Sequence, residues 1–218
     1  MRIERSFFVQ RAECEAENQA ETLSCNQCSS FRCLSRRNLL KSVLGIGFAL
    51  SFGEQAARAQ TDPKKTRPQV GDLLVFALGD RAGQLITRQN VPSGGPPVTT
   101  YPKDPHSQIV RDGSRLNRVL LVRLAPEVLT EQTRSFAAEG IVGYSAVCTH
   151  TGCDVVGWEN ATQHLVCPCH TSTFDAKDRA RVISGPAPKP LAALPLQIVD
   201  GKLTVAGPFS GRVGAEQK

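Results

Sequence analysis

The 218-residue sequence contains few aromatic residues and shows no concentration of positive charge. Tryptophan occurs once and tyrosine twice. Methionine occurs only at position 1, so translation that starts at a later position would need a codon other than ATG. Residues 61–218 have 18 basic and 14 acidic side chains, with no basic run interleaved with aromatic residues, which disfavours a nucleic-acid partner. No internal repeat is visible. With 21% charged and 40% hydrophobic residues, the composition is typical of a globular protein and not of a disordered one.

The sequence also lacks a hydrophobic run long enough to span a bilayer comfortably. Residues 42–53 form an apolar stretch, whereas a membrane-spanning helix needs about 20 residues. This stretch follows SRRNLLK at 35–41, which resembles a twin-arginine export signal with leucine at the usual phenylalanine. It precedes ARA at 57–59, a small-x-small cleavage pattern. We expect residues 1–59 to be a twin-arginine signal with an extended n-region, either cleaved or kept as a membrane anchor. The remaining chain would then lie in the bacterial periplasm or at the periplasmic face of the inner membrane.

The eight cysteines fall into two groups. Four precede the export signal: Cys14, Cys25, Cys28 and Cys33. The Cys25-x2-Cys28 pair is at most half of a metal site, because residues 1–59 contain no histidine and no second close pair. The sequence leaves the role of these four cysteines open, together with the true start codon.

The other four cysteines lie in two short boxes, CTHTGC at 148–153 and CPCHTS at 167–172. Each box can supply one thiolate and one imidazole. Two thiolates can bind one iron of a [2Fe-2S] cluster while two neutral imidazoles bind the other. A structural zinc ion would accept the same ligands, but it gives no reason for the two additional cysteines. The pattern therefore favours electron transfer, with a zinc-stabilised binding module without redox function as the alternative from another class.

Short apolar runs separated by glycine and proline indicate an antiparallel β domain. These runs are residues 73–78, 119–124, 141–147, 191–199 and 203–206. One helix is expected over 126–139, because Pro126 suits the first turn and Gly140 suits the C-terminal cap. Two proline-containing segments are expected to be irregular, with 60–69 as a linker and 92–107 as a long loop. The prediction is an all-β domain over 70–208 with a C-terminal tail at 209–218.

The two boxes resemble those of the Rieske iron–sulfur proteins, in particular the high-potential branch. The resemblance implies a Rieske-type antiparallel β-sandwich over 70–208, with a small cluster-binding subdomain and one inserted helix. It implies a [2Fe-2S] cluster in which Cys148 and Cys167 bind one iron and His150 and His170 bind the solvent-facing iron. It also implies that Ser172 forms a hydrogen bond to a bridging sulfide and that a disulfide joins Cys153 to Cys169. Export to an oxidising compartment would favour such a disulfide, which would clamp the two ligand loops together.

Several residues depart from the pattern of the family. Phe174 stands where many respiratory members have a tyrosine bonded to the sulfur of a cysteine ligand. Fewer donors stabilise the reduced cluster less, so we expect a lower midpoint potential. Thr151 replaces a leucine that shields the cluster, and Thr171 replaces a glycine. The segment GPAP at 185–188 matches the proline-rich loop that covers the cluster in this branch.

The resemblance implies one-electron transfer, with His150 or His170 contacting the donor. We expect an electron-transfer subunit of an oxidoreductase complex rather than a stand-alone enzyme. The first expectation is the iron–sulfur subunit of a quinol–cytochrome c reductase (bc-type) complex, with cytochrome b and c-type cytochrome subunits as partners. The alternative is the small Rieske subunit of a periplasmic molybdenum enzyme such as arsenite oxidase, with a large molybdopterin subunit and no bound quinol. The sequence itself leaves the donor, the acceptor and the reduction potential open.

Overall fold

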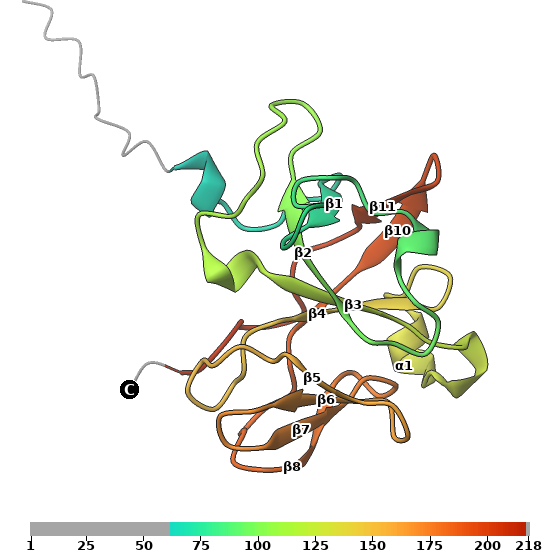
Figure 1. Cartoon of the computed structure of the whole chain (residues 1–218), viewed down its shortest axis with the longest axis vertical. Coiled ribbons are helices and arrows are strands. Elements are labelled where there is room, and N and C mark those ends of the chain that lie inside the picture. Colours follow the sequence, from blue (N-terminus) through green and yellow to red (C-terminus); the bar gives the residue numbers. More distant parts are fainter. Residues whose placement is uncertain (1–61, 217–218) are drawn as a thin grey trace, which may run out of the picture. The chain divides into compact units, whose positions relative to one another are not determined.

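The computed structural model describes residues 62–216 (Figure 1). The predicted export signal and the four N-terminal cysteines lie outside these residues. Within the described range, no helix has the length and hydrophobicity that crossing a membrane requires. The range contains two antiparallel sheets and only short helical segments, which confirms the expected all-β fold with a small subdomain.

The larger sheet has seven strands in the order β10-β11-β1-β2-β3-β4-β9. Their bounds are β1 Leu73–Phe76, β2 Val98–Lys103, β3 Val119–Arg123, β4 Ile141–Ser145, β9 Ala193–Leu194, β10 Leu196–Val199 and β11 Lys202–Val205. The smaller sheet has the order β5-β6-β7-β8. Its bounds are β5 Gly157–Glu159, β6 His164–Cys167, β7 Ser172–Asp175 and β8 Arg181–Ser184. In Figure 1 this smaller sheet lies below the larger one.

Alternation along β3 divides the hydrophobic core between the two faces of the larger sheet. Leu120 and Val122 belong to one buried cluster, whereas Val119 and Leu121 belong to another, as the two-residue period of a strand requires. The first cluster also contains buried residues of the smaller sheet, among them Phe174. The two sheets therefore share one core, and that core forms the base of the loops that carry the two boxes.

The expected helix over 126–139 is wrong in its extent. The structure has a 3-10 turn η4 at Pro126–Val128 and a single helical turn α1 at Glu131–Arg134. Thr130 begins α1, because its side chain accepts a hydrogen bond from the Thr133 N–H. The helix cannot continue to Gly140, since Ala138 pairs with Ile141 in a tight turn.

The expected long loop over 92–107 is also wrong in part, because β2 crosses its middle. Proline normally disfavours a central strand, as it has no N–H for the ladder. Pro102 is tolerated because β3 pairs only with residues 98–100 of β2, so Pro102 lies beyond that pairing. Its carbonyl accepts a hydrogen bond from the Arg111 N–H at 2.8 Å. Pro195 divides the expected strand 191–199 into β9 and β10.

Two segments expected as linker and tail pack against the rest of the domain. The remaining 3-10 turns are η1 Pro63–Lys65, η2 Arg88–Asn90 and η3 Arg115–Asn117. Residues after η1 are held by the Asn117 side-chain amide, which donates to the Thr66 carbonyl at 2.8 Å. Near the other end, Val213 is buried and packs with Val147. Both segments thus reach the neighbourhood of the first box.

Candidate metal centre

The two boxes form loops at one end of the smaller sheet. The first box follows β4 and closes on itself, because the Cys148 N–H donates to the Cys153 carbonyl at 2.8 Å. The second box is the connection between β6 and β7, where Cys167 and Ser172 face each other as a pair of strand residues. Thr171 in this turn has φ +54°, a left-handed conformation in which glycine is the usual residue.

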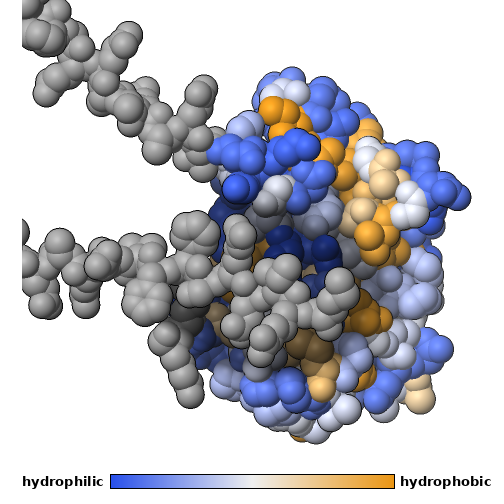
Figure 2. All heavy atoms as spheres, turned by 60° about the vertical axis from the view of Figure 1, so that its left-hand side comes forward, coloured by the Kyte–Doolittle hydropathy of each residue, from blue (hydrophilic) through white to orange (hydrophobic). Residues whose placement is uncertain are grey.

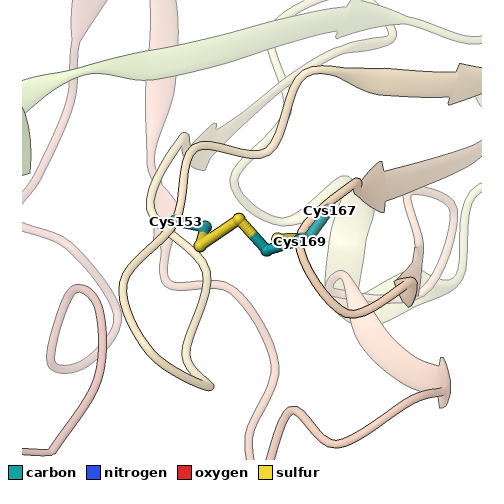
Figure 3. A group of neighbouring side chains, drawn as sticks. All are labelled: Cys153, Cys167 and Cys169. Atoms are coloured by element: carbon teal, nitrogen blue, oxygen red, sulfur yellow. A yellow bond between two sulfur atoms is a disulfide. The ribbon is translucent and has the colours of Figure 1, made fainter.

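A disulfide joins the two loops at Cys153 and Cys169 (Figure 3). This is the pairing that the family resemblance implied. The Cys167 sulfur lies within 4.8 Å of both disulfide sulfurs. The bridge therefore holds the two boxes together directly beside a thiol that is not oxidised.

Cys148 and Cys167 are the free thiols in the described range, and each is 1% exposed. Both belong to the core cluster shared by the two sheets. Burial raises the pKa of the Cys148 thiol, and a hydrogen bond from the His150 backbone N–H opposes that rise. The two buried thiols can bind metal as thiolates when a cation compensates the negative charge.

The two histidines of the boxes point toward each other. The Nδ1 atoms of His150 and His170 are 3.2 Å apart, with the rings nearly perpendicular at 85°. His150 is half-buried and His170 is exposed. In residues 62–216 neither ring has another hydrogen-bond partner. Two Nδ1 atoms that converge without other partners form a nitrogen donor pair at the solvent-facing end of the site.

Ser172 is held by the proline-rich loop at 185–188. Its Oγ accepts a hydrogen bond from the Ala187 N–H at 3.2 Å, so its hydroxyl proton is free to donate elsewhere. The contact needs glycine at 185, where φ is +87° and a Cβ would lie 2.5 Å from the Ser172 Cα. Thr149 adds a second tie to this loop, because its hydroxyl donates to the Lys189 carbonyl at 2.6 Å.

This donor set fits a [2Fe-2S] cluster with mixed ligation. Two buried sulfurs and two converging imidazole nitrogens are the ligand types of a Rieske centre. The exposed end is nitrogen and the buried end is sulfur. The disulfide between Cys153 and Cys169 holds the two ligand loops together beside this donor set.

Comparison with known proteins agrees with this chemistry. The family model of the Rieske [2Fe-2S] domain matches residues 106–195. A protein of Haloferax mediterranei named "Putative respiratory nitrate reductase subunit Rieske" is 32% identical over 193 residues, which cover 83% of this chain and 80% of that protein. The chain belongs to the Rieske [2Fe-2S] family. Its cofactor is thus a [2Fe-2S] cluster and its general role is electron transfer, which replaces the zinc module considered from the sequence.

Other Rieske proteins match over shorter stretches. The cytochrome bc1 complex Rieske iron-sulfur subunit of Streptomyces lividans is 43% identical over 98 residues, 44% of this chain and 58% of that protein. The corresponding Streptomyces coelicolor subunit is also 43% identical over 98 residues, which cover 28% of its length. This chain therefore matches less than two thirds of the length of either relative. The soluble domain of Rieske protein II from Sulfolobus acidocaldarius is 24% identical, with a TM-score of 0.34, covering 44% of this chain and 66% of that one. That structural likeness is too low to support any conclusion about function.

Sequence reasoning missed the contacts that fix the first box from outside. The Arg115 guanidinium donates to the Gly152 carbonyl and also contacts Asp154 at 2.8 Å. Arg118 contacts the other oxygen of Asp154 at 2.7 Å. These partners are 36–39 residues apart in sequence. The acidic residue directly after the box was the one local signal that could have indicated an anchor.

Proposed function

We propose that Cys148 and Cys167 bind one iron of the cluster and that His150 and His170 bind the other through Nδ1. The burial of the two thiols and the convergence of the two Nδ1 atoms at 3.2 Å support this ligand set. When bound, such a cluster accepts and donates one electron. The hydroxyl proton of Ser172 is available for a hydrogen bond to cluster sulfur, because its oxygen already accepts from the Ala187 N–H.

The exposed histidine end is the contact point for the electron donor. A cavity of about 620 Å³ lies beside His150, within the size range of small-molecule sites. Its walls come from the first box, the proline-rich loop and the C-terminal end: Thr149, His150, Thr151, Pro186, Pro188, Ala215 and Glu216. Binding through Nδ1 leaves the other ring nitrogen of His150 to meet a donor in this cavity. A quinol ring fits both the size of the cavity and its mixture of proline and polar lining.

The complex proposed first is a quinol–cytochrome c reductase of the bc type, in which this chain is the iron–sulfur subunit. Electrons would pass from quinol to a c-type cytochrome, with cytochrome b as a neighbouring subunit. The matches to proteins named as bc1 Rieske subunits, at 43% identity, support this assignment. The chain would act at the periplasmic face of the inner membrane, delivered by the twin-arginine signal of residues 1–59.

A second candidate is the small Rieske subunit of another respiratory or periplasmic oxidoreductase, such as a molybdenum enzyme. The relative named as a nitrate reductase Rieske subunit favours it, because that match extends over 83% of the chain, whereas each Streptomyces match covers 44%. In this case the electrons would be exchanged with a large catalytic subunit and no quinol would bind at His150.

The ligand set is tested by iron content and by the EPR spectrum of the reduced full-length protein. The wild type should hold two irons per chain and give the signal of a mixed-ligand cluster. Cys148→Ser and His150→Ala should lose both. His164→Ala is the matched control, because His164 lies on β6 three residues before Cys167 and is half-buried. A His150→Ala protein with full iron content and an unchanged EPR signal would exclude His150 as a ligand.

The two candidate complexes are distinguished in native membranes. The bc-type assignment predicts that added quinol reduces the cluster, that oxidised c-type cytochrome reoxidises it, and that cytochrome b co-purifies with this chain. The second candidate predicts that a large molybdopterin subunit co-purifies and that quinol alone leaves the cluster oxidised. Failure of quinol to reduce the cluster in membranes that contain cytochrome b would contradict the first proposal.

A further inference from the structure

A second cavity, of about 260 Å³, lies next to the first box and has no residue of the proline-rich loop 185–188 in its lining. Three arginines line it, Arg67, Arg115 and Arg212, and no acidic residue does. We call it the arginine hollow. Figure 2 views the molecule from the left-hand side of Figure 1, where the part of the surface that is not grey has both hydrophilic and hydrophobic areas. A cavity lined by three guanidinium groups attracts anions, above all carboxylates, which arginine can bind through two parallel hydrogen bonds.

Two of the three guanidinium groups are held by hydrogen bonds, and the third arginine follows from the placement of its backbone. The Arg67 guanidinium donates to the Leu116 carbonyl at 2.9 Å, and that of Arg115 donates to the Gly152 carbonyl. Arg212 precedes Val213, which is buried against Val147. The hollow is therefore built by three distant segments of the chain, and the guanidinium groups of Arg67 and Arg115 are positioned before any ligand arrives.

Two of the three guanidinium groups form no salt bridge within the described residues. Arg115 is paired with Asp154. Across residues 62–216, neither Arg67 nor Arg212 forms a salt bridge. Both side chains belong to exposed residues. The charges of Lys189 and, to a smaller extent, Arg212 lower the pKa of Glu216, so the positive charge of the hollow that faces solvent is matched only in part.

The hollow adjoins the place where an electron partner must approach. Thr151 and Ala215 line both the arginine hollow and the cavity beside His150. In the neighbouring cavity the one acidic residue, Glu216, is already paired with Lys189. A protein that reaches His150 therefore covers the hollow as well, and there it meets unpaired arginine.

We propose that the arginine hollow binds an acidic side chain of the electron-transfer partner, and that this contact positions the partner at His150. The proposal rests on the electron-transfer role above and adds the chemistry of the partner's docking surface. A carboxylate from the partner would pair with Arg67 and Arg212, the two guanidinium groups of the hollow that form no salt bridge in residues 62–216. The partner surface facing the first box is therefore acidic, and association weakens with increasing salt.

The test measures binding of a fluorescein-labelled hexaglutamate peptide to the cluster-loaded full chain by fluorescence anisotropy, with hexaglutamine as the uncharged peptide. Arg212→Gln should weaken hexaglutamate binding about fivefold to tenfold, between the effects of an exposed and a desolvated ion pair. Arg67→Gln should act in the same direction. Arg134→Gln is the matched control, since Arg134 on α1 is exposed and its replacement changes the net charge equally. It should change the affinity less than about twofold.

Each other outcome overturns the proposal. Equal weakening by Arg212→Gln and Arg134→Gln would mean that the peptide senses only net charge. No binding of hexaglutamate by the wild type would exclude a carboxylate site. If inorganic phosphate bound with the same dependence on Arg212 and hexaglutamate did not bind, the hollow would take a free anion and not a partner side chain. Because the assay follows binding and not electron transfer, failure here is distinguishable from failure of the cluster assignment, which the EPR spectrum of the same sample reports.

Discussion

The close approach of Gly185 to the second box gives a stability prediction that can be worked out from distances. A Cβ at Gly185 would lie 2.5 Å from the Ser172 Cα and 2.9 Å from its backbone nitrogen. These are backbone atoms, so they cannot move aside as the end of a flexible side chain would. Gly185→Ala also places a Cβ at φ +87°, which costs about 1–2 kcal/mol. Overpacking adds about 1–3 kcal/mol, so we expect a total loss of about 2–5 kcal/mol in the free energy of unfolding.

Gly201→Ala is the matched control, because Gly201 has φ +73° and a Cβ there would meet nothing within 4 Å. It should show only the conformational cost of about 1–2 kcal/mol. Thermal unfolding of the cluster-loaded proteins, followed by circular dichroism, measures both, and 1 kcal/mol corresponds to about 2–4 °C for a chain of this size. Equal shifts in Tm for the two variants would refute the steric argument and the close contact between the proline-rich loop and Ser172.

The remaining predictions concern a disulfide, an ion pair and the cluster environment. Replacing both Cys153 and Cys169 by serine removes a disulfide between residues 16 apart in sequence, which should lower the free energy of unfolding by about 3 kcal/mol. In thermal unfolding, dithiothreitol should lower the Tm of the wild type and leave that of the variant unchanged. An equal effect of dithiothreitol on both proteins would contradict this prediction. The Arg111 side chain is 7% exposed, and its Nε lies 2.6 Å from the Asp72 carboxylate. Asp72→Ala removes this ion-pair partner. Its cost in urea unfolding should be about 3–5 kcal/mol, and a loss below about 1 kcal/mol, as for exposed pairs, would be inconsistent with burial. Phe174→Tyr places a hydroxyl in the core cluster that contains the two free thiols and should raise the midpoint potential in a redox titration; an unchanged or lower potential would show that no added donor reaches the cluster.

The strands that sequence patterns predicted are those that bury an apolar run. Residues 119–124 contain valine and leucine at almost every position, and β3 is indeed covered on both faces. β7 was not singled out from the sequence, because Ser172–Asp175 reads as polar although all four residues are buried. The residues of β7 are buried by the neighbouring strands of the smaller sheet and by the loops around it. The hydrophobicity of a short sequence window cannot predict burial that depends on neighbouring segments.

The chemistry of the site was predictable because its residues are local, whereas the contacts that support it were not. Each box places a cysteine and a histidine within four residues of each other, so the donor types could be identified without a structure. The hydrogen bond from Thr149 to the Lys189 carbonyl spans 40 residues. The arginine hollow combines Arg67, Arg115 and Arg212, and no spacing rule connects positions so far apart.

The remote contacts to the boxes share a chemical feature that bears on how the site is built. Arg115 and Ser172 each anchor a ligand loop by bonding to a backbone group, the Gly152 carbonyl and the Ala187 N–H respectively. Loops that expose imidazole to solvent bury little apolar surface of their own, so such polar contacts must supply their rigidity. Because the contacts go to backbone, they leave the thiols and imidazoles without competing partners. The same segments then shape the surface outside the loops: the anchor Arg115 is also a wall of the arginine hollow. Rigidity of the ligand loops and recognition of an acidic partner are therefore coupled through one residue, and a change at Arg115 should affect both, whereas a change at Arg212 should affect recognition alone.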